Sequence, residues 1–155
     1  MSELVEALKN KLGDLNPEVS EGKGFISVSV DSSKLREAAK RLLEMGFDHV
    51  KTVTAVDYMK EKQFEVIYHA SSYLNTDLAK YIVELKTRIP RDNPEVDSLS
   101  DIWVSAEFLE RETFEFFGIN FRGHPDLRPI LLLQEVADKH PLRKDFIVKE
   151  EGIFK

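Results

Sequence analysis

Ionisable side chains crowd into the stretch from residue 107 to residue 146. The stretch contains Glu110-Arg111-Glu112, then Arg122, and then the two similar motifs His124-Pro125-Asp126-Leu127-Arg128 and His140-Pro141-Leu142-Arg143-Lys144-Asp145. Carboxylates and guanidinium groups can form bidentate pairs with another protein surface. Imidazoles can hydrogen-bond a neighbouring backbone or carry protons near neutral pH. These residue types therefore make the positions candidates for contacts with another protein surface, and the residues alone do not decide whether that surface belongs to this chain or to a partner.

The residues alone leave an alternative open at each position. Glu110, Arg111 and Glu112 could equally lie on a solvated helix surface, where an i,i+4 pair contributes only a few tenths of a kcal/mol. His124 and His140 each precede a proline, which suggests that these imidazoles act as structural pins by bonding backbone groups. Arg128, Arg143 and Lys144 would then point outward. A proton relay through the histidines is the other possibility.

Known catalytic patterns are missing from the chain. The histidines at positions 49, 69, 124 and 140 show neither HxxxH nor HExxH spacing, and the chain has no cysteine. The lack of cysteine excludes disulfides, iron–sulfur ligation and thiolate zinc sites on this chain. Neither a GxSxG nucleophile turn nor a complete phosphate-binding glycine loop is present. We therefore expect no catalytic, cofactor-binding or metal-binding residue here.

Residues 119–155 form a segment that we call the strap. Prolines at positions 125, 129 and 141 interrupt it, and it shows no sustained periodicity. Long segments of this kind are usually functional or disordered, and the apolar residues Phe121, Leu127 and Phe146 and the run 130–133 argue against disorder. We expect the strap to dock on another surface, and the residues leave open whether that surface belongs to this chain or to a partner.

Hydrophobic periodicity predicts the elements that must position these residues. Apolar spacing favours helices at 2–12, about 33–45 and 101–117, with strands at 24–30, 48–57, 64–70 and 81–89. This order predicts an α+β fold in which helices pack on a mostly antiparallel four-stranded sheet. We expect residues 1–118 to form this domain and the strap to extend from it.

Composition limits the partners. No apolar run approaches the roughly 18 residues that span a bilayer, so any membrane connection should come through other proteins. The net charge of −6 argues against nucleic-acid binding. Residues 119–149 carry six Lys/Arg against four Asp/Glu, and this mildly basic strap on an acidic body suits a complementary protein surface.

Two spaced motifs resemble a known family. ERETFEFFGINFRGHPDLRPIL at 110–131 and HPLRKDF at 140–146 closely resemble the signature of the C-type subunit of respiratory complex I, the NADH:quinone oxidoreductase. They also resemble the related subunits of F420H2 dehydrogenases and of membrane-bound energy-converting [NiFe] hydrogenases. Phe108, Pro129, Lys139 and the stretch 115–117 depart from the commonest pattern of the family. These departures leave open which branch the chain serves.

The resemblance implies a structural subunit rather than a catalyst. Such a protein has no cofactor and packs in the peripheral arm against a subunit resembling the [NiFe]-hydrogenase large subunit, the D-type subunit of complex I. It lies beside the B-type small subunit. The resemblance implies that the partner contacts are made by Glu110, Arg111, Glu112, Arg122, His124 to Arg128 and His140 to Asp145. Iron–sulfur clusters and, in the hydrogenase branch, a nickel–iron centre belong to the partners. The implied location is the cytoplasmic side of the cell membrane. The alternative from another class is a free-standing adaptor or small enzyme with a pocket between sheet and strap. The electron donor, the acceptor and the pumped ion stay open.

Overall fold

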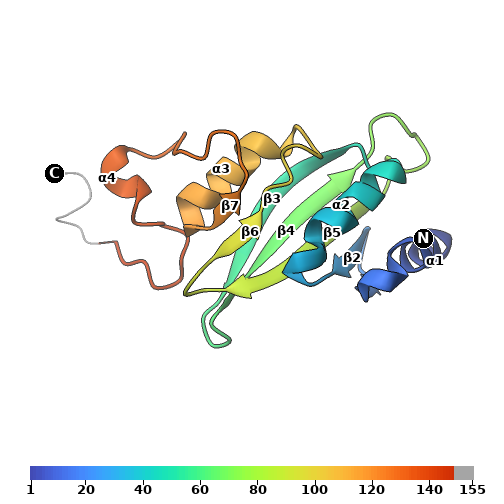
Figure 1. Cartoon of the computed structure of the whole chain (residues 1–155), viewed down its shortest axis with the longest axis horizontal. Coiled ribbons are helices and arrows are strands. Elements are labelled where there is room, and N and C mark those ends of the chain that lie inside the picture. Colours follow the sequence, from blue (N-terminus) through green and yellow to red (C-terminus); the bar gives the residue numbers. More distant parts are fainter. Residues whose placement is uncertain (149–155) are drawn as a thin grey trace.

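The computed structural model describes residues 1–148, in which helices flank an open sheet (Figure 1). The helices are α1 (Ser2–Leu12), α2 (Leu35–Glu44), α3 (Ala106–Phe117) and the short α4 (Gln134–Ala137), with 3-10 turns at Gly13–Leu15 and Ser32–Lys34. The strands are β1 (Glu18–Glu21), β2 (Phe25–Ser29), β3 (His49–Tyr58), β4 (Gln63–Ser71), β5 (Ile82–Pro90), β6 (Glu95–Asp97) and β7 (Asn120–Arg122). Helix α2 contacts β5 and helix α3 contacts β3. The strap begins at residue 119, directly after α3 ends at Phe117.

The main sheet has the strand order β1-β2-β5-β4-β3. Strands β3, β4 and β5 are antiparallel neighbours, whereas β2 pairs with β5 in parallel. The chain leaves β2, crosses through α2 to the far edge at β3, and returns through β4. Strand β5 therefore arrives beside β2 in the same direction. The predicted α+β class is confirmed.

The predicted strand count of four was too low, because the main sheet has five strands. The missed strand β1 has the sequence EVSE, which is short, mostly exposed and lacks apolar alternation. The prediction also missed the small parallel pair in which β6 of the body joins β7 of the strap, with Val96 opposite Phe121. Three-residue strands are too short for a periodicity signal.

Alternation along the central strands builds the core. Every second side chain of β4 and β5 faces the helices and is almost completely buried, among them Phe64, Val66, Tyr68, Val83, Leu85 and Ile89. Trp103 closes this core from the loop before α3, and its Nε1 donates to the Phe47 carbonyl at 2.8 Å. The loop that leads into α3 is thereby fixed to the end of the sheet.

Two hydroxyl groups fasten α3 to the free edge of β3. The Ser105 hydroxyl accepts from the Val50 amide and donates to the Val50 carbonyl, both at 3.0 Å. Farther along, the Thr113 hydroxyl donates to the Val53 carbonyl at 3.0 Å. Ser105 therefore makes no side-chain cap for the helix. The helix begins at Ala106 rather than at the predicted residue 101.

Buried threonines in two settings allow a matched test. The Thr87 hydroxyl is buried and has no hydrogen-bond partner among residues 1–148, whereas the Thr113 hydroxyl binds a carbonyl of the sheet edge. We expect Thr87→Val to raise the free energy of unfolding by about 1 kcal/mol, because valine removes an unpaired polar group at nearly constant shape. Thr113→Val should lower it by about 1–3 kcal/mol, because the Val53 carbonyl loses its partner.

Urea unfolding at pH 7 measures both changes, provided that the dependence of the free energy on denaturant stays constant. Shifts of the same sign for the two variants would contradict this account of the β3 edge.

Candidate functional site

Glu110 lies inside the molecule and joins α3 to the sheet. Its side chain is fully buried and accepts from the Tyr68 hydroxyl at 2.8 Å, the Ser98 hydroxyl at 2.6 Å and the Leu99 amide at 2.7 Å. Burial raises the pKa of Glu110 above its ordinary value, although these donors act in the opposite direction. Burial, and then the nearby Glu110 carboxylate, raise the pKa of Tyr68 well above its ordinary value, so the phenol remains a donor.

Arg111 binds the backbone of the strap. Its Nε donates to the Arg128 carbonyl at 2.9 Å, and Nη2 lies 3.5 Å from the Pro129 carbonyl. The guanidinium also lies 3.8 Å from the Asp126 carboxylate and 5.6 Å from the centre of the Phe108 ring. An arginine fork suits this task because several donors reach different acceptors from one rigid group.

Glu115 binds the next part of the strap. Its side chain is fully buried and accepts from the Leu131 amide at 3.1–3.2 Å and from the Leu132 amide at 2.6 Å. Arg111 and Glu115 are four residues apart on α3, so they share one side of the helix. Together they pair main-chain carbonyls and amides of residues 128–132, which form no regular secondary structure.

Both histidines act as the predicted structural pins. His124 donates from Nε2 to the Glu107 carbonyl at 2.8 Å and accepts the Asp126 amide on Nδ1 at 3.0 Å, which together define a neutral imidazole. His140 donates from Nδ1 to the Glu115 carbonyl at 3.1 Å. The strap is thereby fixed to α3 near both ends of the helix, and this prediction is confirmed.

The second histidine motif also caps the C-terminus of α3. The last carbonyls of a helix have no partner within the helix. Here the Phe116 carbonyl accepts from the Leu142 amide at 3.0 Å, and the Phe117 carbonyl accepts from Arg143 Nε at 2.6 Å. A cation at this end is also favoured by the helix dipole.

Arg143 turns inward, so the prediction that it points outward is wrong. Its guanidinium lies 5.2 Å from the centre of the Phe64 ring, and desolvation, together with the charge of Arg91, lowers its pKa. Gly118 makes the close approach possible. Its φ is +76°, and a Cβ there would lie 2.7 Å from the His140 ring and 2.8 Å from Arg143 Nη2.

Asp57 and Arg91 hold the end of the described strap. Asp57 has a side chain only 1% exposed. It binds the Arg91 guanidinium at 2.8 and 3.1 Å and accepts from the Lys144 amide at 2.9 Å. Arg91 also pairs with Asp145 at 2.9 Å. Burial alone would raise the pKa of Asp57, but Arg91 and the Lys144 amide outweigh it and hold the pKa below its ordinary value.

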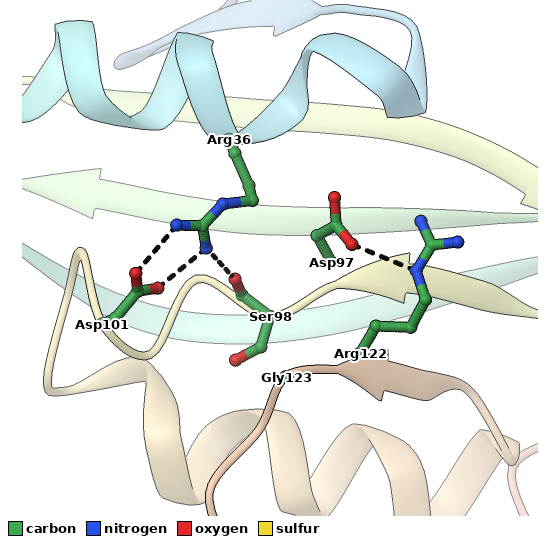
Figure 2. A pocket seen from close by; sticks show the side chains of 6 residues that line it. All are labelled: Arg36, Asp97, Ser98, Asp101, Arg122 and Gly123. Atoms are coloured by element: carbon green, nitrogen blue, oxygen red, sulfur yellow. Dashed lines mark hydrogen bonds and ion pairs between the residues drawn. The ribbon is translucent and has the colours of Figure 1, made fainter.

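Arg122 lies apart from the other candidates, in a polar cleft of about 490 Å³ between α2, the loop after β6 and β7 (Figure 2). Its Nε donates to Asp97 at 3.0 Å. Across the cleft, Arg36 forms two 2.8 Å bonds with Asp101 and one of 2.7 Å with the Ser98 carbonyl. Arg36 thus attaches α2 to the loop after β6, and Arg122 joins β7 to β6, as the two ion pairs in Figure 2 show.

The remaining candidates lie at or near the surface. Leu127 packs partly against the core, and Arg128 is 72% exposed with a 2.8 Å bond to Asp126. The other members of the set are Glu112, Pro125, Pro141, Leu142 and Lys144, which are half-buried or exposed. The outward direction predicted for Arg128 and Lys144 is confirmed.

Comparison with known proteins decides the family. The model of the family described as "Respiratory-chain NADH dehydrogenase, 30 Kd subunit" matches residues 28–152. The chain belongs to this family. The match extends the resemblance seen in the motifs at 110–131 and 140–146 over most of the chain.

Relatives in the 30-kDa subunit family span several enzymes. The chain is 35% identical over 145 residues to the C-type subunit of the F420H2 dehydrogenase of Methanosarcina mazei, covering 92% of this chain and 89% of the relative. It is 36% identical over 153 residues to the C-type subunit of the NADH-quinone oxidoreductase of Moorella thermoacetica, covering 98% and 99%.

Solved structures agree with this assignment. A chain of the membrane-bound sulfane sulfur reductase, an archaeal respiratory membrane complex, superposes with a TM-score of 0.81 at 28% identity, covering 94% of this chain and 86% of that chain. A trypsin-resistant fragment of Nqo5 superposes with a TM-score of 0.70 at 27% identity, covering 80% and 98%.

The site of this family member is thus built largely from contacts within the chain. Sequence reasoning missed Tyr68, Ser98 and Glu115, together with Asp57 and Arg91 of the body. The i,i+4 spacing of Arg111 and Glu115 was the one available signal for Glu115. Within residues 1–148, no three or more His, Asp or Glu side chains converge as metal ligands, and no helix combines the length and apolarity needed to span a bilayer.

The contact between Asp57 and the strap should depend on pH. Asp57→Asn should lower the free energy of unfolding at pH 7 by about 1.5–3 kcal/mol, because the amide cannot balance the Arg91 charge. The folded pKa of Asp57 is lowered, so its contribution is fully present above about pH 4. The contribution is lost as the pH falls through that lower folded pKa.

Urea unfolding of both proteins between pH 7 and pH 2.5 measures the difference. Asp145→Asn is the control, because Asp145 is 51% exposed and should change stability by less than about 1 kcal/mol. A difference between the wild type and Asp57→Asn that grows with falling pH would contradict the assignment.

Proposed function

We propose that the chain is a structural subunit of a complex I-like, membrane-associated oxidoreductase and carries no redox cofactor of its own. It packs on a partner resembling the hydrogenase large subunit, the D-type subunit, beside the B-type iron–sulfur small subunit. It lies on the cytoplasmic side of the membrane and is attached there through other subunits. Membership of the 30-kDa subunit family and the names of the relatives support this proposal.

The observation that carries the docking role is the way the strap is held. Its main chain binds α3, and apolar side chains of the strap face outward. Leu131 is 61% exposed and Leu133 is 68% exposed. Ile130, Leu142, Ile147 and Val148 are also exposed. A strap whose main chain is held by α3 at several points and whose apolar side chains are exposed suits burial by a second protein.

The use of the ionisable groups supports positioning rather than chemistry. His124, Arg111 and Glu115 each bind a main-chain group of the strap or of α3. Catalytic acids and bases need access to a substrate, whereas these groups are buried against the chain. The three side chains therefore serve to hold the docking surface in one shape.

The alternative function, a free-standing adaptor or small enzyme, requires a pocket between the sheet and the strap. The cavity at that place lies between β3, α3 and Leu142 and has a volume of about 180 Å³. Small-molecule sites are typically about 300–1,000 Å³. The cavity is below this range, which argues against a substrate site at this position.

Charging the exposed strap tests the proposal. Leu133→Asp should weaken retention of the neighbouring subunit at least tenfold, because an apolar side chain of this size contributes about 1.5–3 kcal/mol when buried. Leu133 occupies the N-cap of α4, where aspartate is favoured. The isolated chain should therefore fold as before.

The measurement uses the tagged chain in its host, gentle solubilisation of the membranes and identification of the retained subunits. Leu74→Asp is the control, because Leu74 is 90% exposed and lies in the loop between β4 and β5. Equal retention of a hydrogenase-large-subunit-like protein by wild type and Leu133→Asp would contradict the docking role of the strap.

A further inference from the structure

An apolar stripe with one carboxylate runs along the outer side of α3. Val104, Phe108, Glu112 and Phe116 follow one another at intervals of four residues, so they lie on one side of the helix and of the turn before it. Val104 is 79% exposed and Phe108 is 61% exposed. Leu142, which is 54% exposed and hydrogen-bonded to the Phe116 carbonyl, extends the stripe onto the strap.

A groove accompanies the stripe where α3 meets the edge of β3. The cavity of about 180 Å³ is lined by Val53 and Thr54 of β3, by Glu112 and Phe116 of α3, and by Leu142 of the strap. Its walls are mainly apolar, and the Glu112 side chain lies at the position where the stripe and the groove meet. A protruding side chain of another protein could enter this groove.

Glu112 differs from the other charged residues of its helix motif. Glu110 binds Tyr68, and Arg111 binds the strap. Glu112 is half-buried, yet it forms no hydrogen bond or ion pair with any residue of the range 1–148. If a second protein covered this carboxylate without pairing it, the loss of hydration would be an uncompensated free-energy cost. A protein that covers the stripe must therefore supply a cation at this place.

We propose that the stripe and its groove receive a segment of the neighbouring subunit in which one lysine or arginine is flanked by apolar side chains. The cation pairs with Glu112, and the apolar side chains cover Phe108 and Phe116. The apolar contacts provide most of the buried interface area, and the single ion pair fixes the register of the segment along α3. This inference rests on the proposed docking function and assigns the chemistry of the partner.

Two substitutions of Glu112 test the inference in the assembled complex. Glu112→Gln keeps the shape of the side chain and removes its charge, and it should weaken retention of the neighbouring subunit about three- to tenfold. Glu112→Arg places two cations together and should weaken retention more than tenfold. Glu61→Arg, in the exposed turn between β3 and β4, makes the same charge change away from α3 and should behave like the wild type.

Retention is measured on the complex purified through the tagged chain, at increasing concentrations of potassium chloride, with thermal melting of each isolated variant to confirm folding. The wild type should lose its partner at a higher salt concentration than Glu112→Arg. Unchanged retention with Glu112→Arg, together with lost retention in Leu133→Asp, would overturn the inference and leave the docking function standing. Unchanged retention in both variants would overturn both.

Discussion

Main-chain amides and carbonyls need hydrogen-bond partners wherever a chain without regular structure lies against a protein. In this molecule α3 supplies such partners to several main-chain groups of residues 128–142. Arg111 donates to carbonyls of the strap, and Glu115 accepts from its amides. The Phe116 carbonyl at the end of the helix accepts from the Leu142 amide. The shape of the outer surface depends on this pairing, because the side chains of the strap can be presented outward only while its backbone is held by the helix.

Helix α3 can hold the strap because the body holds the helix. Its inward side is fixed by Glu110 to Tyr68 and by the Thr113 hydroxyl to the edge of β3. Its remaining surface carries the apolar stripe around Glu112. Helix α3 thus packs on the sheet, binds the strap and carries the surface that we assign to a partner. A substitution that breaks one of the buried contacts would shift α3 and thereby alter its other contacts.

Local patterns predicted much of the fold. Helix α1 was predicted at its observed limits because its apolar spacing ends at Gly13, and β4 and β5 were recognised from alternation. The short β1 and β6 carried too few residues for a period. The pinning role of His124 and His140 could be predicted from the proline that follows each of them, but their acceptors, the Glu107 and Glu115 carbonyls of α3, could not. The contacts of Asp57 with Lys144 and of Glu115 with Leu132 join residues that are distant in sequence, and no local pattern encodes such pairs. Arg143 was misassigned for this reason, since charge alone does not show that a side chain covers Phe64.

The central claim is that the strap is already fastened to α3 in the chain by itself. Amide hydrogen exchange of the purified chain, compared with the assembled complex, tests it most directly. We predict that the amides of Leu131, Leu132, Leu142 and Lys144 exchange slowly in the chain alone, because each donates to α3 or Asp57. Exchange of these amides at the rate of an unstructured segment in the chain alone, with protection only in the complex, would contradict the account.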